Sequence, residues 1–310
     1  MALIEGWLPP NREHYDLLVR LWQFYPLVAS LQWPIKWYGM GKTSVNSVLN
    51  LPGRIGWLTM ESPGFLTLLY VMRTLTEQEG ITDLPWQNKF LAGLFVIHYC
   101  YRAVLFPLIA PSMSPLHGAV WLMGVNFQLC NAICLGGWLA AYGPRTAADW
   151  SAQLGSWPTV QFVAGVAVFF LGLAANYYHD DVLRAIRWRE KERRAVAARQ
   201  AKKDGGRTTD GNGASAASVS PPRVPAVDKH YQLPEAGLFR YMLYPHYFVE
   251  WVEWTGFYMA AGWSCVPARM FVVNEIAAML PRAVRGRAWY IERFGAEKVG
   301  SRWTIIPGVL

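Results

Sequence analysis

The stretch HYQLPEAGLFRYMLYPHYFVEWVEWTG, residues 230–256, decides how this chain is interpreted. It places acids, histidines and tyrosines in a segment that is otherwise apolar enough to be buried or membrane-embedded. Ionisable side chains are costly in such surroundings unless they are paired, and they mark functional sites by default. The stretch therefore predicts chemistry carried out within a membrane.

The composition of the whole chain favours the same class of protein. Of its 310 residues, 53% are hydrophobic and only 16% are charged, whereas a soluble domain carries about 25% charged residues. Apolar runs of about 17–25 residues can span a bilayer. Such runs lie at 13–32, 57–76, 88–110, 117–141, 157–177, 246–264 and 266–284. We predict an all-α, polytopic membrane bundle of about seven transmembrane helices.

Lysine and arginine are concentrated in one connection, between residues 184 and 229. The positive-inside rule makes this connection cytosolic, so the C-terminus, two spans further on, is expected in the cytosol too. A basic patch can also bind nucleic acid, but beside a transmembrane helix the topological explanation is favoured. The cysteines lie within apolar runs without the spacing of a metal site, so we expect neither nucleic acid nor metal.

One segment interrupts the apolar pattern. Residues 180–203 have the charged face of a helix that leaves the bilayer, and residues 204–222 are rich in Gly, Ser, Ala and Pro. Such a composition buries too little surface to offset the entropy of ordering. We predict a single domain over 1–310, interrupted by a flexible, basic, low-complexity cytosolic loop at 190–228.

The run GRIGWLTMESPGF, residues 53–65, contains Glu61 in an otherwise apolar setting. A carboxyl group kept neutral by burial can donate a hydrogen bond, which makes Glu61 a candidate acid. The alternative is an interfacial glutamate that caps a short helix.

The segment HYCYR, residues 98–102, places polar side chains within an aliphatic run. Tyr99 and Arg102 are three residues apart and share a helix face, which predicts a polar stripe inside the bundle. The alternative is a satisfied histidine and tyrosine with an arginine that reaches toward the interface.

The segment ANYYHDDVLRAIR, residues 175–187, combines Asn176 with a periodic charged face. Asp180, Arg184 and Arg187 stand at i, i+4 and i+7, so one face presents a carboxylate and two guanidiniums. These groups could bind the ribose and phosphates of a nucleotide cofactor. An internal Asp–Arg pair at the membrane boundary is the alternative.

Glu250 and Glu253 follow Pro245 on the next predicted helix. Acids are favoured in the first turns of a helix by its dipole, which could account for both without a cofactor. The sequence has no GxGxxG motif between a strand and a helix and no P-loop. A dinucleotide would therefore bind without a Rossmann fold.

Taken together in chain order, the segments described above resemble the steroid 5α-reductase (3-oxo-5α-steroid 4-dehydrogenase) family. The most specific similarity is C-terminal and comprises Tyr231, Pro234, Gly237-Leu238-Phe239, His246-Tyr247-Phe248, Glu250, Glu253-Trp254-Thr255-Gly256, WYIERFG at 289–295 and IIPGVL at 305–310. The resemblance covers roughly residues 38–310 apart from the interrupting loop. It implies a seven-helix enzyme of the endoplasmic reticulum that uses NADPH to reduce the double bond of an enone lipid.

The resemblance also implies roles for individual residues. The catalytic pair would be Glu61 and Tyr99, with Tyr99 hydrogen-bonded to a neutral Glu61. Cofactor-side positions would be Asn176, Asp180, Arg187, Tyr231, His246, Glu250 and Tyr290. Substrate-side positions would be Tyr38, Trp57 and Arg102.

The chain also departs from the family pattern. Arg287 stands where many members have a histidine, and the loop APSMSPLH, residues 110–117, lacks an expected basic residue. Trans-2-enoyl-CoA reductases and polyprenol reductases share much of the C-terminal pattern and remain alternatives. Membrane methyltransferases that bind S-adenosylmethionine have a related proline–aromatic–Glu element, but they leave Glu61 and the 98–102 stripe unexplained.

Overall fold

The computed structural model describes residues 2–35, 37–44, 46–205 and 232–310, and within them the chain is mainly helical. The α-helices are α1 (Arg12–Gln23), α2 (Tyr25–Ser30), α3 (Gly53–Gln78), α4 (Trp86–Tyr99), α5 (Phe106–Ile109), α6 (Gly118–Gly137), α7 (Ala147–Leu154), α8 (Pro158–Gly205), α9 (Pro245–Ala261), α10 (Val266–Phe294) and α11 (Ala296–Val299). Short helical turns are the 3-10 turns η1 (Gly41–Thr43) and η4 (Gly237–Arg240) and the π-helical turns η2 (Cys100–Leu105) and η3 (Trp138–Tyr142). The strands β1 (Asn50–Leu51) and β2 (Leu116–His117) pair antiparallel and tie together the loops before α3 and α6.

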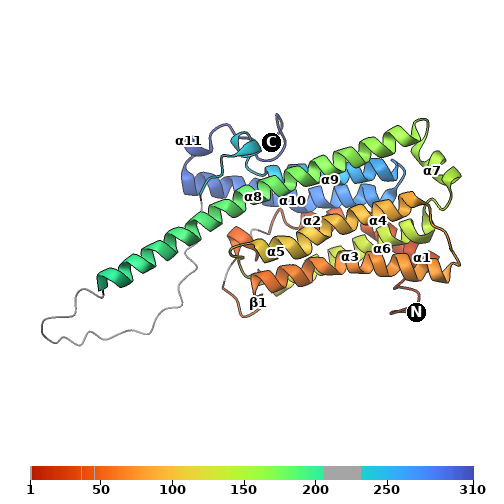
Figure 1. Ribbon diagram of the computed structural model, residues 1–310, viewed down its shortest axis with the longest axis horizontal. Coiled ribbons are helices and arrows are strands. Elements are labelled where there is room, and N and C mark those ends of the chain that lie inside the picture. The colour runs from red at the N-terminus through yellow and green to blue at the C-terminus, as the bar shows by residue number, and fades with distance from the viewer. Residues whose placement is uncertain (1, 36, 45, 206–231) are drawn as a thin grey trace, which may run out of the picture.

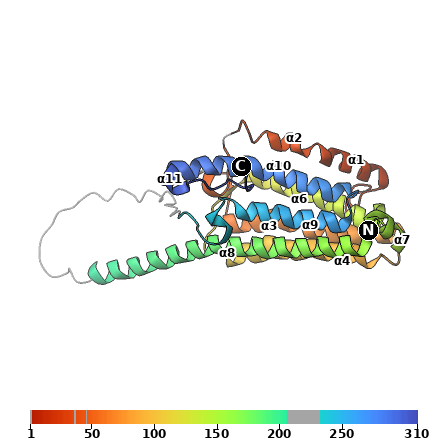
Figure 2. The same cartoon turned by 90° about the horizontal axis from the view of Figure 1, so that it is seen from above.

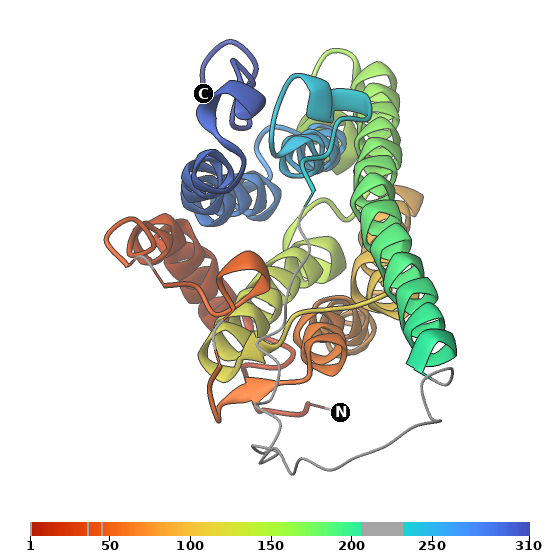
Figure 3. The ribbon, with the colours of Figure 1, turned by 90° about the vertical axis from the view of Figure 1, so that its left-hand side faces the viewer.

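The helices lie side by side in an elongated bundle, from which the last part of α8 projects (Figure 1). Within the bundle, α8 packs against α9 and α3 packs against α6. The short helices α1 and α2 lie along α10 at one edge, as Figure 2 shows. Viewed from the end, α9 and α10 lie on one side of the bundle and α3 and α6 on the other (Figure 3).

Three helical stretches of the described chain are long and apolar enough to cross a bilayer. They are Trp86–Ile109, Gly118–Tyr142 and Pro158–Ala201. The other expected spans also fall in helices, namely α3, α9, α10 and the α1–α2 pair, which is divided at Phe24. The sequence prediction of a mainly helical protein with membrane-spanning segments is therefore confirmed.

The contact between α8 and α9 depends on glycine. A Cβ atom on Gly165 or Gly256 would overlap backbone atoms of the facing helix, and one on Gly172 would overlap the backbone of Glu253. Small residues at such positions allow two helix backbones to approach closely. This approach brings the polar residues that follow Gly172 next to those of α9.

An aromatic layer fixes α4 and α10 against α9. The ring of Trp254 on α9 lies 4.3 Å from that of Phe271 on α10 and 5.7 Å from that of Phe95 on α4. All these rings are almost completely buried. Aromatic pairs in this geometry contribute beyond the area they bury. The layer holds the C-terminal end of α4 close to the polar side chains of α9.

The basic segment begins as a continuation of α8. The helix expected over residues 180–203 is part of α8, which ends at Gly205. Residues 190–205 of the predicted loop are therefore helical, and the remainder of that loop, 206–228, lies outside the described residues. The assignment of 1–310 to one interrupted domain stays a prediction.

Candidate active site

A π-helical turn at the end of α4 presents the HYCYR segment to the bundle interior. Single π turns within α-helices occur frequently at functional sites. The side chains of His98, Tyr99 and Tyr101 are buried. The indole N–H of Trp57 donates to the Arg102 carbonyl at 3.0 Å, and the Arg102 guanidinium lies over the Trp57 ring. The arginine therefore points into the protein and does not reach toward the interface.

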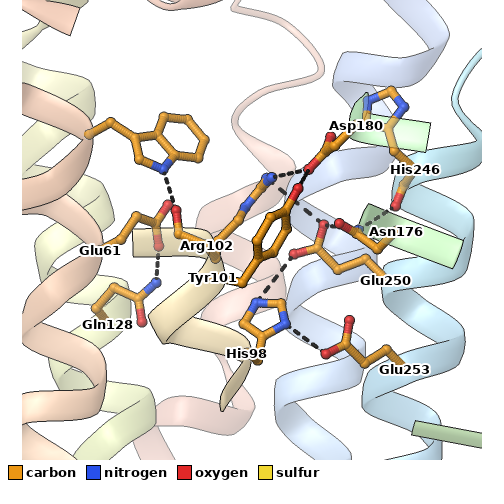
Figure 4. Close-up of polar contacts among 11 residues, drawn as sticks. Glu61, His98, Tyr101, Arg102, Gln128, Asn176, Asp180, His246, Glu250 and Glu253 are labelled. Atoms are coloured by element: carbon orange, nitrogen blue, oxygen red, sulfur yellow. Dashed lines mark hydrogen bonds and ion pairs between the residues drawn. The ribbon is translucent and has the colours of Figure 1, made fainter. Parts of the chain in front are cut away.

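Arg102 is the centre of an ion-pair network (Figure 4). Its guanidinium nitrogens lie 3.4 Å from Asp180 Oδ2 and 3.9 Å from Glu250 Oε2. The Tyr101 hydroxyl donates to Asp180 at 3.2 Å, and Arg184 donates to that hydroxyl at 3.3 Å. Buried charges persist only when they are paired and hydrogen-bonded. The network thus joins η2 to both α8 and α9.

The two acids of α9 have specific partners. His98 Nδ1 lies 2.7 Å from Glu253 Oε1, and His98 Nε2 lies 3.9 Å from Glu250 Oε1. Asn176 of α8 donates to Glu250 Oε2 at 3.2 Å and to the His246 carbonyl at 2.9 Å. A helix dipole accounts for none of these side-chain contacts. Together they make the α8–α9 side of the site a continuous polar network.

Glu61 lies on α3, on the other side of this centre (Figure 4). Its Oε2 accepts a hydrogen bond from the Gln128 amide of α6, and the Gln128 side chain also interacts with the Tyr99 hydroxyl. Gly64, one turn beyond Glu61, has no room for a Cβ atom because Gln128 lies against it. The expected direct hydrogen bond between Tyr99 and Glu61 is not among the contacts of the described residues. Gln128 instead interacts with both.

Of the remaining predicted residues, Tyr38 lies against α10. The guanidinium carbon of Arg282, on α10, lies 4.4 Å from the centre of the Tyr38 ring. Tyr38 also interacts electrostatically with Glu61. Tyr231 lies outside the described residues. Its predicted role at the cofactor therefore stays a prediction.

The remaining predicted residues lie further from Arg102. Arg187 is exposed on α8, one turn beyond Arg184, yet its charge still acts on Asp180. Tyr290 is buried in α10, with its ring 6.1 Å from that of Tyr244. No group of three or more His, Cys, Asp and Glu side chains in the described chain is arranged to hold a metal ion.

The structure adds two residues that the sequence motifs did not identify. Gln128 lies between Asn126 and Asn131 in the otherwise apolar run 117–141, and polar side chains in such a run are the signal that could have revealed it. Tyr101 does not share a face with Tyr99 at ordinary helical spacing. Tyr101 lies in the π-helical turn η2, and its hydroxyl donates to Asp180.

The C-terminal part of the chain matches a known protein family. The sequence model described as 3-oxo-5-alpha-steroid 4-dehydrogenase matches residues 223–310. A Schizosaccharomyces pombe protein, named only as uncharacterized, is 31% identical over 83% of this chain and 84% of its own length. The 3-oxo-5-alpha-steroid 4-dehydrogenase 1 of Bos taurus is 27% identical over 81% of this chain and 79% of its own length. A steroid 5-alpha-reductase of Solanum lycopersicum is 26% identical over 87% of this chain and 86% of its own length.

This chain belongs to the steroid 5α-reductase family. Members of the steroid 5α-reductase family are oxidoreductases that act on CH–CH groups. Membership and the apolar helices together indicate an integral membrane protein. The matched segment 223–310 contains His246, Glu250 and Tyr290, whereas Glu61 and Tyr99 fall outside it.

Proposed function

We propose that this chain reduces the carbon–carbon double bond of an enone lipid with NADPH, and that a 3-oxo-Δ4 steroid or sterol is its substrate. Family membership supports the reaction class. The observation that carries the proposal is the buried group formed by Glu61, Gln128 and Tyr99. It offers hydrogen-bonding side chains in an otherwise apolar setting, as the recognition of a lipid ketone requires.

In this proposal, Tyr99 is the hydrogen-bond donor to the substrate ketone. When a hydride is added to the β-carbon of an enone, negative charge develops on the carbonyl oxygen. A donor aimed at that oxygen is worth about 3–4 kcal/mol in the transition state. Gln128 and Glu61 would keep the Tyr99 hydroxyl oriented toward the substrate, since both side chains are held in one group with it. A proton then completes the reaction at the α-carbon.

The α8–α9 side has the chemistry to bind NADPH, which would supply the hydride. Asp180 and Glu250 are carboxylates that can accept hydrogen bonds from ribose hydroxyls or an amide. Arg184 has a buried Nε that lacks a hydrogen-bond partner among the described residues, although both of its terminal nitrogens are engaged. Such a guanidinium N–H can donate to a phosphate oxygen. Asn176 and Arg102 would keep these carboxylates in position.

We further propose the complete topology of about seven spans, in which α3, α9, α10 and the α1–α2 pair cross the bilayer with the three most apolar helices. The basic continuation of α8 would then face the cytosol, with the C-terminus on the same side. Residence in the endoplasmic reticulum follows from the family relationship as part of this proposal.

The proposal is tested by purifying the chain in detergent and following NADPH oxidation with a 3-oxo-Δ4 steroid such as progesterone. Formation of the 5α-reduced ketone in step with NADPH loss is the expected result. NADPH binding without steroid turnover would redirect the search to enoyl-CoA or polyprenol substrates. Binding of S-adenosylmethionine in place of NADPH would overturn the reductase assignment.

A further inference from the structure

His98 of α4 lies between the two acids of α9 (Figure 4). Its Nδ1 is 2.7 Å from Glu253 Oε1, and its Nε2 is 3.9 Å from Glu250 Oε1. All three side chains are almost completely buried. The first distance is that of a hydrogen bond, whereas the second is too long for one. One nitrogen of the ring is therefore engaged, and the other faces a carboxyl group across a short gap.

Glu253 has His98 as its hydrogen-bonding partner and no other within the described chain. Its Oε2 is buried without a partner, and its backbone lies against Gly172 of α8. A carboxylate with one bare oxygen in such surroundings is far more costly than a neutral acid. In the neutral state Glu253 donates its O–H to Nδ1, so the ring proton lies on Nε2 and is directed at Glu250.

Glu250 is held at one of its two oxygens. Its Oε2 accepts from Asn176 at 3.2 Å and lies 3.9 Å from the Arg102 guanidinium. Its Oε1 has no hydrogen bond to any described residue, and His98 Nε2 faces it. A carboxylate can accept about four hydrogen bonds, so Glu250 keeps the capacity to bind a ligand. Hydrogen bonds of active sites are often long in the empty protein and shorten in the complex.

The His98 ring is confined by aromatic side chains. Its centre lies 4.6 Å from that of Trp254 and 4.9 Å from that of Tyr99. Both of these neighbours are buried, Trp254 in the aromatic layer between α4, α9 and α10. Because the ring is enclosed on these sides, its two nitrogens stay directed at the two acids.

We propose that His98 is a positioning residue: Glu253 fixes its ring, and its Nε2–H holds Glu250 Oε1 in the orientation that binds the nucleotide cofactor. The proposal rests on the function proposed above and assigns the His98–Glu253 pair a task within that cofactor site. The alternative is a purely structural pair, whose hydrogen bond joins α4 to α9. The two roles depend on different nitrogens, since positioning requires Nε2 and the structural role requires Nδ1.

Two amide substitutions separate these nitrogens. The side-chain amide of asparagine lies near the place of Nδ1, and that of glutamine lies near the place of Nε2. His98→Asn therefore keeps a partner for Glu253 and loses the one for Glu250, whereas His98→Gln does the reverse. Equilibrium titration with NADPH, which requires no turnover, should give a Kd within about threefold of the wild type for His98→Gln. For His98→Asn the Kd should rise about ten- to a hundredfold.

Thermal unfolding in detergent should rank the two variants in the opposite order. His98→Asn should melt at a higher temperature than His98→Gln, because it keeps the shorter of the two contacts. A purely structural pair would instead make the less stable variant the weaker binder. If His98→Asn fails to fold, His98→Phe takes its place, since phenylalanine keeps the ring and lacks both nitrogens.

Glu253→Met tests whether Glu253 acts through His98. In the wild-type background it should weaken NADPH binding severalfold, because the ring then loses the group that orients it. Added to His98→Asn, it should weaken NADPH binding no further, since a residue that acts only through His98 has nothing left to position.

His117 provides the matched control. It belongs to β2, and its Nδ1 accepts from the backbone N–H of Ala119 at 3.2 Å at the start of α6. His117→Asn and His117→Gln should both leave the Kd of NADPH within about twofold of the wild type.

The proposal is overturned if His98→Asn binds NADPH no more weakly than His98→Gln. Additive losses in the double variant would overturn the action of Glu253 through His98. Failure of the proposed function has a different signature. A wild type that binds NADPH but reduces no enone leaves the order of the variants measurable, whereas a wild type that binds no NADPH overturns the cofactor assignment and this proposal with it.

Discussion

The two sides of the candidate site are built differently. On the α8–α9 side, the Arg102 guanidinium pairs with both Asp180 and Glu250, and Asn176 donates to Glu250. On the α3–α6 side, Glu61 accepts a hydrogen bond from the neutral amide of Gln128. A paired network can hold a charged cofactor at little reorganisation cost, whereas sparse neutral groups suit a mostly apolar ligand. The difference teaches that ion pairs organise the first side, whereas a neutral hydrogen bond organises the second.

Arg102→Met should produce the largest effect, because it removes the charge that pairs Asp180 and Glu250. Breaking a buried ion pair from one side costs about 3–5 kcal/mol, and NADPH binding should be lost with it. Thermal unfolding in detergent and NADPH titration measure both. Arg193→Met is the matched control: Arg193 pairs with Glu190 on the exposed part of α8, where such a pair contributes about 0–1 kcal/mol. Equal effects of the two substitutions would contradict the paired network.

Tyr99→Phe should have the second-largest effect, and it should affect only the side of the site that contains Glu61 and Gln128. Loss of the donor to the ketone is expected to reduce kcat about 100- to 1000-fold, while the Kd of NADPH stays unchanged. Glu61→Gln is expected to act in the same direction. Steady-state turnover gives kcat for each variant, and NADPH titration gives the Kd of NADPH.

Tyr101→Phe sharpens the comparison with Tyr99→Phe. It removes a hydrogen bond to Asp180 and should therefore weaken NADPH binding severalfold with a smaller change in kcat. If Tyr99→Phe keeps full activity, or if both tyrosine variants change the same kinetic constant, the division of the site into two sides is wrong.

Gly256→Val tests how the α8–α9 side is held together. The new side chain would overlap the backbone of α8 at Phe169 and Gly165, and overpacking of this kind costs about 1–3 kcal/mol. Gly93→Ala is the control, because no atom lies within 4 Å of a Cβ placed there. Gly256→Val should melt at a lower temperature than Gly93→Ala. A neutral Gly256→Val would show that the close approach of the helices is not required.

The smallest effect is expected at the cap of α7, away from both sides of the site. The backbone N–H of Arg145, together with Thr146, holds the pKa of Asp149 below its usual range. An acid whose pKa is lowered by folding adds stability above its unfolded value of about 3.9, and this contribution is lost as pH falls through the folded pKa. Asp149→Asn should therefore lower the melting temperature slightly near neutral pH, and the difference should shrink as the pH falls below about 3.9. A difference that grows on acidification would contradict this assignment.

The sequence by itself determined the class of protein and supplied the candidate residues of the site. Apolar runs of spanning length predicted the helices, since a backbone in lipid must satisfy its own hydrogen bonds. Ionisable residues within apolar runs marked Glu61 and Asp180 as candidate functional residues, because such groups are costly to bury without a partner.

Only the tertiary structure decided which of these groups meet. Asp180 is 78 residues from Arg102 in the chain, and Gln128 is 67 residues from Glu61. Helical periodicity gives the face on which a side chain lies but not the helix that it faces. That choice depends on the close approach of α8 and α9 at Gly172 and Gly256 and on the contact of Gln128 with Gly64 between α6 and α3. These are properties of packing between distant segments, and no local pattern in the sequence encodes them.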